Sequence, residues 1–377
     1  MTMTIFTRTR IAVSSASFVA LLTAGLGTAQ AEDFDLDALI EAARAEPQLT
    51  VFDSTGKIKT MAEAFAAKYG LDAVGTKMKA PAQIEMFDRE ARAGNVQADV
   101  AIISDASAVI SQLIPTGAVT SWVPPDLADK INPDYQDPLV VVASANLWTY
   151  NTELYDSCPV SNIWQLTEPE WKGKVAMQDP LRNPGLTNWF NQMETHHDAT
   201  VAAAYEAQFG KALETDAGSA TKAWIKALGQ NAPLLGSSDS AASESVGAPG
   251  QSEGFMGLMS SAKYRDNNDS DYKLGICDGI KPFAGFTSVN VGVIAAGSDS
   301  PNAAKLFLHY AMTPEGIAPQ NKDGKMSSNS DVGLPDDEPS GVANVLDQVQ
   351  AYRISSAGDD WETRQDWQDF WLLNYKR

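Results

Sequence analysis

Residues 138–151 read PLVVVASANLWTYN, and residues 287–296 read TSVNVGVIAA. Both runs are rich in β-branched and small apolar residues, so both are predicted to be extended. The first run is too long for an ordinary strand, which usually contains about five or six residues. We therefore expect these two runs to cross from one structural region of the chain into another.

The segments around and between the two runs alternate between strand and helix patterns. Strands are predicted near residues 48–54, 98–104, 173–179, 252–261 and 273–277. Helices are predicted over residues 57–69, 81–92 and 106–114, from 187 to 193, near 199–209 and 219–229, and over 301–312. This alternation is typical of a parallel sheet that is covered by helices on both faces.

The two long runs enclose residues 151–283, which suggests an insertion. We predict an α/β fold of two lobes, with two mixed sheets joined by two crossing hinge strands. The first lobe is expected to be discontinuous (residues 32–149 and 284–377), with the second lobe inserted at residues 150–283. The aromatic-rich tail at 342–375 is expected to form helices packed on the outside.

Composition limits the classes of function. The chain has 377 residues, with 28 Lys and Arg against 48 Asp and Glu, and its formal net charge is −20. A nucleic-acid-binding protein needs a basic surface to neutralise phosphates, and docking on an anionic membrane needs one too. The composition instead indicates an acidic globular protein of one large or two medium domains.

The N-terminal 31 residues are predicted to be a signal peptide. They contain Arg8, Arg10 and no acid, then an apolar run over residues 11–26, and they end in the small-x-small pattern of residues 29–31. The apolar run is short and rich in Ser, Thr and Gly, which disfavours a transmembrane anchor. We therefore expect an exported protein without a membrane anchor.

Cys158 and Cys277 are the only cysteines. In an oxidising compartment outside the cytoplasm they are expected to form a disulfide, and two free thiols are the alternative. A two-thiol metal site is disfavoured because no histidine partner lies nearby in the sequence.

Two turns have the residue types of an anion site. Ser54-Thr55-Gly56-Lys57 lies where a strand ends and a helix begins, so its backbone N–H groups and hydroxyls could hold an anion. A plain helix cap is the alternative reading of this turn. The turn from Asp179 to Asn188 repeats the pattern, with Thr187 and Asn188 at a predicted helix start.

Two other motifs suggest different chemistry. Residues 250–254 (GQSEG) match the G-x-S-x-G pattern around Ser252, with His309 downstream. A nucleophile elbow needs a strand before the serine and a helix after it, whereas the predicted order here is the reverse, so a secreted serine hydrolase is a distant alternative. The adjacent His196 and His197 would point in different directions on a helix, which favours a surface pair over a metal site.

With these segments placed, the chain resembles a periplasmic solute-binding protein of an ABC importer. It is most similar to the branch that binds ferric ion, thiamine, aminoethylphosphonate or hexose phosphate. The resemblance rests on VFDSTGK (51–57), FDREARAGNVQADV (87–100), WTYN (148–151), EWKGKVAMQDP (170–180) and SPNAAKLFLHYAMTPEG (300–316). It implies two lobes that close on a ligand in the cleft, a periplasmic location, an ABC permease as partner, no catalysis and no cofactor. A monomer is expected.

The resemblance also implies a set of ligand-binding residues. These are Ser54, Thr55, Gly56, Lys57, Ser104, Asp105, Asp179, Thr187, Asn188, Ser261, Lys263 and Tyr264. Ferric-binding members present two consecutive tyrosines where this chain has Ala262 and Lys263, which counts against iron. Lys263 and the hydroxyl-rich turns suit a phosphate or phosphonate through charge-assisted hydrogen bonds. A small phosphorylated or phosphonate anion is therefore the expected ligand, with a ferric or other metal ion as the alternative.

Overall fold

The structure is a computed structural model that describes residues 1–2 and 34–376. The predicted signal peptide therefore lies outside the described residues, apart from Met1 and Thr2. The chain divides into a short unit, Met1–Phe34, and a large unit that begins at Asp35. The fold below is that of the large unit. None of its described helices is both long enough and apolar enough to cross a bilayer.

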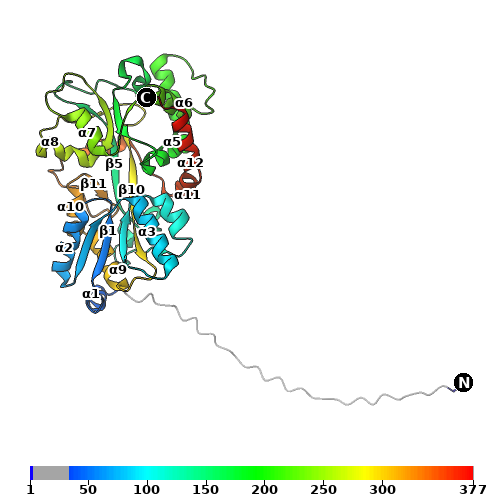
Figure 1. Ribbon diagram of the computed structural model, residues 1–377, viewed down its shortest axis with the longest axis vertical. Coiled ribbons are helices and arrows are strands. Elements are labelled where there is room, and N and C mark those ends of the chain that lie inside the picture. Colours follow the sequence, from blue (N-terminus) through cyan, green and yellow to red (C-terminus); the bar gives the residue numbers. More distant parts are fainter. Residues whose placement is uncertain (3–33, 377) are drawn as a thin grey trace. The chain divides into compact units, whose positions relative to one another are not determined.

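The first lobe contains strands and helices from two separated parts of the chain. Its elements are α1 (Leu36–Arg44), β1 (Leu49–Asp53), α2 (Lys57–Tyr69), β2 (Ala73–Lys77), α3 (Ala80–Ala93), β3 (Val100–Ile103), α4 (Ala106–Ala108), β4 (Val119–Thr120), α9 (Pro301–Ala311), α10 (Pro314–Asn321) and β11 (Lys325–Ser327). Figure 1 shows α2, α3 and α9 around the strands of this lobe.

The helices of this lobe follow from their sequence patterns. In α2 the buried residues Ile58, Met61, Ala62 and Phe65 recur at helical spacing, so one face packs on the core. The helix ends at Gly70, whose φ of 68° lies in the left-handed region that glycine adopts without strain. The structure matches the predicted range of this helix at both ends.

The second lobe lies between the two crossing strands in sequence. Its elements are β6 (Val175–Gln178), α5 (Pro184–Phe209), α6 (Ala220–Gln230), β7 (Leu234–Gly236), α7 (Asp239–Gly247), β8 (Met256–Ser260), α8 (Asp266–Asp269) and β9 (Leu274–Ile276). A single turn of 3₁₀ helix, Ser261–Arg265, follows β8. Among the described residues, both lobes use parallel strand–helix–strand units, as the alternation of patterns predicted.

Two long strands, β5 (Val140–Asn151) and β10 (Gly285–Ala295), connect the lobes. They pair with each other in antiparallel fashion, while one end of β10 pairs with β3 and the C-terminal half of β5 pairs with β8 and β9. The order β2-β1-β3-β10-β5-β8-β6-β7 is therefore hydrogen-bonded without a break. The two predicted sheets are joined into one because the crossing strands belong to both.

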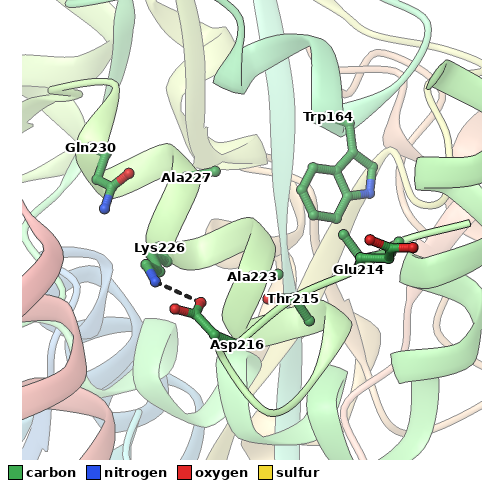
Figure 2. Close-up of a pocket in the computed structure, with 9 residues that line it drawn as sticks. Trp164, Glu214, Thr215, Asp216, Ala223, Lys226, Ala227 and Gln230 are labelled. Carbon is green, nitrogen blue, oxygen red and sulfur yellow. Dashed lines mark hydrogen bonds and ion pairs between the residues drawn. The ribbon is translucent and has the colours of Figure 1, made fainter.

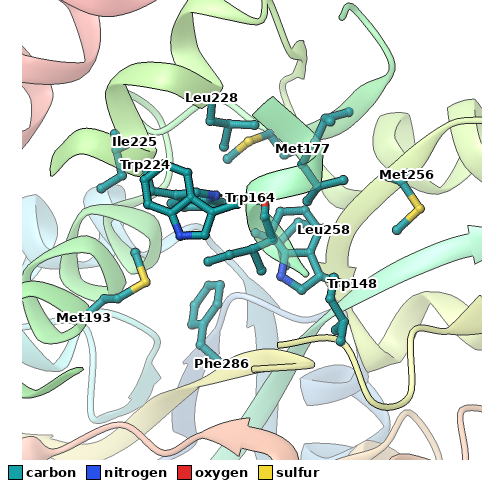
Figure 3. Packing of buried hydrophobic residues seen from close by; sticks show 14 of the residues in the cluster. Trp148, Trp164, Met177, Met193, Trp224, Ile225, Leu228, Met256, Leu258 and Phe286 are labelled. Atoms are coloured by element: carbon teal, nitrogen blue, oxygen red, sulfur yellow. Dashed lines mark hydrogen bonds between the residues drawn. The ribbon is translucent and has the colours of Figure 1, made fainter. Parts of the chain in front are cut away.

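The core of the second lobe is aromatic. Trp224 packs edge-on against Trp148 and Trp189, with ring centroids 6.3 and 5.8 Å apart, and Trp189 stacks on Phe286 at 4.5 Å. Figure 3 shows Trp148, Trp224 and Phe286 surrounded by methionine and leucine side chains. The disulfide between Cys158 and Cys277 is present at the edge of this core. It joins the loop after β5 to the end of β9.

The C-terminal segment returns to both lobes. It contains β12 (Val349–Gln350), α11 (Ala357–Glu362) and α12 (Arg364–Asn374). Strand β12 pairs with β10, α11 contacts α4 and α5, and α12 packs on α5 and α6. The tail is helical as expected, but α12 buries Trp367 and Trp371 in the core of the second lobe. The boundaries predicted for the two lobes stay predictions.

The structure differs from the predicted elements in several respects. Residues 184–209 form one helix rather than two. It begins at Pro184, where the Asn183 side-chain oxygen accepts a 3.0 Å hydrogen bond from the Gly185 N–H and caps the helix. The predicted helix over residues 106–114 is a short α4 followed by a π-helical turn, Val109–Leu113. Among the elements that the pattern analysis did not predict are α1, β2, α7, α10 and β11. Strand β2 is largely exposed, so it lacks a buried apolar pattern.

Candidate functional site: the cleft between the lobes

A cleft of about 380 Å³ lies between the two lobes. This volume falls in the range of small-molecule sites. The first lobe contributes Ser54, Thr55, Lys77, Lys79 and Ser104; the second contributes Gln178, Arg182, Ser237, Ser238, Asp239, Ser240, Lys263 and Arg265; and the crossing strands contribute Ser144, Asn146, Phe286, Ser288 and Asn290. Asn183, Ser260, Asp323 and Lys325 also belong to the polar lining.

The crossing strands give the cleft a polar floor. Ser144 of β5 stands opposite Ser288 of β10 in the strand register, and Asn146 stands opposite Phe286. Since side chains two residues apart lie on the same face of a strand, these residues face the cleft together. The floor therefore offers hydroxyl and amide groups beside one aromatic ring.

Four helices begin at the cleft. Residues at or just before the starts of α2, α3, α5 and α7 line it, because each helix follows the carboxyl end of a strand that points toward it. The first turn of a helix carries unsatisfied backbone N–H groups and the positive end of the helix dipole. Helix starts from both lobes therefore contribute positive potential to the same space.

Six cationic side chains line the cleft, against two carboxylates. The cations are Lys77, Lys79, Arg182, Lys263, Arg265 and Lys325, and the carboxylates are Asp239 and Asp323. This local balance is opposite to the net charge of the whole chain. The ammonium groups of lysine and the guanidinium groups of arginine donate charge-assisted hydrogen bonds to carboxylate and phosphoryl oxygens.

The cations differ in how far they are already engaged. Arg265 donates to Asp323 at 2.7 Å, Lys263 donates to the Ser240 hydroxyl at 2.8 Å, and Lys325 donates to Gln320 at 3.0 Å. Lys77, Lys79 and Arg182 are exposed, and their side chains make no hydrogen bond or ion pair within residues 34–376. At least three cations thus remain available to a ligand.

Four of the residues predicted from sequence lie in the cleft: Ser54, Thr55, Ser104 and Lys263. Gly56 and Lys57 lie beside it, and the Lys57 ammonium is 3.6 Å from Asp323. Asp179 lies in the turn after β6, where its carboxylate accepts a hydrogen bond from the Leu181 N–H at 3.0 Å. The ligand-binding roles of these residues stay predictions.

Three further predicted residues have side chains that are bonded to other parts of the protein, and their ligand-binding roles stay predictions. Thr187 is buried and its hydroxyl donates to the Pro184 carbonyl at 2.9 Å, because the helix begins three residues earlier than the pattern suggested. Ser261 is buried and donates to the Gly324 carbonyl at 3.2 Å. The buried Tyr264 hydroxyl pairs with Thr149 at 2.8 Å.

Asp105 and Asn188 belong to a buried network that joins the lobes. We call Asp105, Ser107, Asn188 and Arg364 the Arg364 network. Arg364 of α12 donates two hydrogen bonds to Asp105, at 2.9 and 2.7 Å, and one to Ser107 at 2.7 Å. Asn188 of α5 donates to the Ser107 hydroxyl at 3.0 Å. Asp105 and Asn188 therefore hold the lobes together, and neither side chain faces the main cleft.

Several cleft residues were not predicted. Lys77 ends the exposed strand β2, and Lys79 precedes α3. Arg182 lies within the turn from Asp179 to Asn188, which the sequence analysis had identified as a candidate anion site, so its position could have been predicted. The SSDS cluster at residues 237–240 is a typical helix start, and this signal would have located α7.

A second hollow, of about 660 Å³, lies on the surface of the second lobe. Figure 2 shows Trp164 on one side of it and residues of α6 on the other. Two of its polar groups are already paired: Lys226 contacts Asp216 at 2.9 Å, and the Trp164 N–H donates to the Val201 carbonyl at 3.0 Å. It offers less ligand-binding chemistry than the cleft.

The structure does not support a serine hydrolase. Ser252 is an exposed turn residue, and strand β8 follows it where an elbow would need a helix. His309 lies on α9 of the first lobe, with its Nε2 atom 2.9 Å from Asp126. His196 contacts the Ser356 hydroxyl at 2.6 Å. Among the described residues, no cluster of three or more His, Cys, Asp or Glu side chains is placed to hold a metal ion.

Residues 49–324 match the family model of bacterial extracellular solute-binding proteins. The chain belongs to this family. The family resemblance inferred from sequence is therefore confirmed. Its known members are transport proteins rather than enzymes. A search of curated proteins finds no match.

Solved structures of solute-binding proteins share the fold. Iron-bound HitA from Pseudomonas aeruginosa has a TM-score of 0.66 and 14% identity, covering 86% of this chain and 99% of its own. AfuA from Actinobacillus pleuropneumoniae, with fructose-6-phosphate bound, has a TM-score of 0.64 and 18% identity, covering 87% and 98%. An ABC-transporter substrate-binding protein from Agrobacterium tumefaciens has a TM-score of 0.66 and 16% identity, covering 88% and 95%.

Proposed function

We propose that this solute-binding protein captures a small phosphorylated or phosphonate anion between its lobes and delivers it to an ABC permease. The observation that carries the proposal is the set of six cationic side chains around one cleft. Helix starts from both lobes add N–H donors and positive potential to the same space. A bound anion would contact both lobes and so favour their closure.

The acidic net charge does not oppose this function. Exposed charges more than about 8 Å from the ligand are largely screened at physiological ionic strength. Cations that line the cleft act at contact distance, where a charge-assisted hydrogen bond is about twice as strong as a neutral one. The local cations therefore decide which ligands bind.

A ferric ion is the alternative ligand, since proteins of similar fold include iron-bound HitA and a ferric binding protein from Campylobacter jejuni. The cleft chemistry favours the anion. Iron requires hard anionic oxygens, whereas Tyr264 is buried, bonded to Thr149, and has a pKa that burial raises above its usual value. Cations in the cleft would also repel a trivalent metal ion.

The proposal is tested by calorimetric titration of protein that has been refolded from denaturant to remove carried-over ligand. The probes are inorganic phosphate, fructose 6-phosphate, 2-aminoethylphosphonate, thiamine and ferric citrate. We expect binding by the phosphoryl compounds. Binding of ferric citrate alone, or of none of these probes, would refute the proposed ligand class.

Two substitutions connect binding to the cleft. Lys77→Met and Lys263→Met are each expected to weaken phosphoryl binding roughly tenfold, because each removes a charge-assisted hydrogen bond. Lys59→Met is the matched control, since Lys59 is exposed on α2 and does not line the cleft. An equal loss of affinity in all three variants would mean that the anion is attracted by the net surface charge rather than bound in the cleft.

A further inference from the structure

Asp239 is an unusual residue in a cleft that is otherwise suited to anions. It is the first residue of α7 and lines the cleft beside Ser238 and Ser240. The other cleft carboxylate, Asp323, is neutralised by Arg265 at 2.7 Å and Lys57 at 3.6 Å. Within the described residues, Asp239 makes no such ion pair within 4 Å.

The Asp239 carboxylate is held in place by a neutral donor. The side-chain amide of Gln178, at the end of β6, donates a hydrogen bond to its Oδ1 atom. The cations whose charges act on it are Lys263, from the turn after β8, and Lys325, from β11. Arg182 and Arg265 line the same cleft. The Ser260 backbone N–H also donates to this carboxylate, so neutral donors on β6 and β8 hold a group that lines the cleft.

We propose that Asp239 is a specificity-determining residue that accepts a hydrogen bond from a proton on the bound anion, so that the cleft takes phosphoryl groups and rejects sulfate and sulfonates. This inference rests on the proposed function and narrows its substrate class. An ionised carboxylate is only an acceptor. If the ligand group also has only acceptors, its oxygens and the Asp239 carboxylate repel each other. This repulsion is what excludes sulfate and sulfonates.

Phosphoryl groups and sulfonates differ in this respect. The second pKa of a phosphoryl group is about 6, so near neutral pH it can keep one proton at small cost. A sulfonate has the same shape and a charge of −1 but holds no proton in this range. Asp239 therefore distinguishes two groups that the surrounding cations alone would bind in the same way.

The pH dependence has a definite direction. Burial raises the pKa of Asp239, while the hydrogen bonds from Gln178 and the Ser260 backbone and the charges of Lys263 and Lys325 oppose that rise. When the pH falls toward this raised pKa, the carboxyl gains a proton and becomes able to donate to an acceptor-only ligand. Sulfonate binding by the natural protein should therefore strengthen as the pH is lowered toward the raised pKa of Asp239.

The test compares 2-aminoethylphosphonate with its sulfonate isostere taurine, and inorganic phosphate with sulfate, in the natural protein and in Asp239→Asn. The natural protein is expected to prefer the phosphoryl member of each pair at least about tenfold at pH 7.5. Asp239→Asn places an amide donor at the site, so the preference should fall severalfold and the pH dependence of sulfonate binding should disappear.

Asp269→Asn is the control, because it makes the same charge change on α8, at an exposed residue outside the cleft. It should keep the preference of the natural protein. Equal affinity of the natural protein for both members of each pair would overturn the inference while leaving the proposed function intact. An unchanged preference in Asp239→Asn would overturn it as well. If Asp239→Asn does not fold, the pH profile of sulfonate binding to the natural protein decides, and a flat profile refutes the proposal.

Discussion

Asp360 shows how a single buried carboxylate can link stability to pH in this protein. Its side chain is fully buried in α11 and accepts hydrogen bonds from Asn191, Gln192 and Tyr352 at 2.8, 2.8 and 2.9 Å. Burial raises its pKa from the ordinary value of 3.8 to about 6, and the three donors only partly oppose that rise. The folded protein therefore binds a proton here more tightly than the unfolded chain does.

We expect the free energy of unfolding to fall as the pH rises from about 4 to about 6, because the native state must release the Asp360 proton in this window while the unfolded chain has already lost it. Asp360→Asn should reduce that fall by at most about 3 kcal/mol. Urea unfolding of the natural protein and the variant at several pH values measures the difference. The same pH dependence in both proteins would contradict this role of Asp360.

At the scale of elements, α12 connects the lobes through the Arg364 network. Helix α12 packs on the second lobe, whereas its first residue, Arg364, is paired with Asp105 of the first lobe. Both side chains are largely removed from solvent, with exposures of 15% and 4%. A buried carboxylate that loses its partner is costly.

Arg364→Met should therefore destabilise the protein by about 3–5 kcal/mol, because it leaves Asp105 buried without a counter-charge. The double variant Asp105→Asn with Arg364→Met should recover part of this loss. Chemical unfolding of Arg364→Met, of Asp105→Asn and of the double variant gives the free energies of unfolding that a double-mutant cycle needs. If the double variant is as unstable as the sum of the single variants, the two residues act independently and the network does not couple them.

The disulfide acts on the second lobe as a whole. Cys158 and Cys277 are separated by 119 residues, so the bond restricts a long loop of the unfolded chain. Replacing both cysteines with serine is expected to lower the free energy of unfolding by up to about 4–5 kcal/mol. Unfolding curves of the variant and of the natural protein, each with and without reductant, provide the measurement. A reductant effect in the variant would indicate a cause other than this bond.

At the scale of the whole described unit, the cleft is formed by elements of both lobes. Helix starts from α2 and α3 face it from the first lobe, and those of α5 and α7 face it from the second. A ligand that bridges the lobes should order backbone amides on both sides, whereas one that binds to a single lobe should not.

Hydrogen exchange in the presence of fructose 6-phosphate, or of whichever phosphoryl probe binds best, should slow at the first turns of α2, α3, α5 and α7 together. The first turn of α9 is the internal control, because its amides are occupied by Glu46 away from the cleft. Protection confined to the helices of one lobe would contradict capture between the two.

The sequence by itself determined the architecture to a large extent. The runs at 138–151 and 287–296 predicted the crossing strands, and the pattern ending at Gly70 predicted α2. Both predictions were possible because a buried apolar face and a helix-ending glycine can be recognised in the local sequence. The turn at Ser54 and Thr55 and the cation Lys263 also lie in the cleft, where local patterns and the family resemblance had placed a site.

Only the tertiary structure decided which polar groups meet. Lys77 and Lys325 come from an exposed edge strand and a short late strand, and nothing in either local pattern indicates that both face one cleft. Conversely, the side chains of Asn188 and Tyr264 are occupied by residues distant in the sequence, Ser107 and Thr149. Apolar periodicity is a local property of the chain, whereas the convergence of charges depends on how separate elements pack.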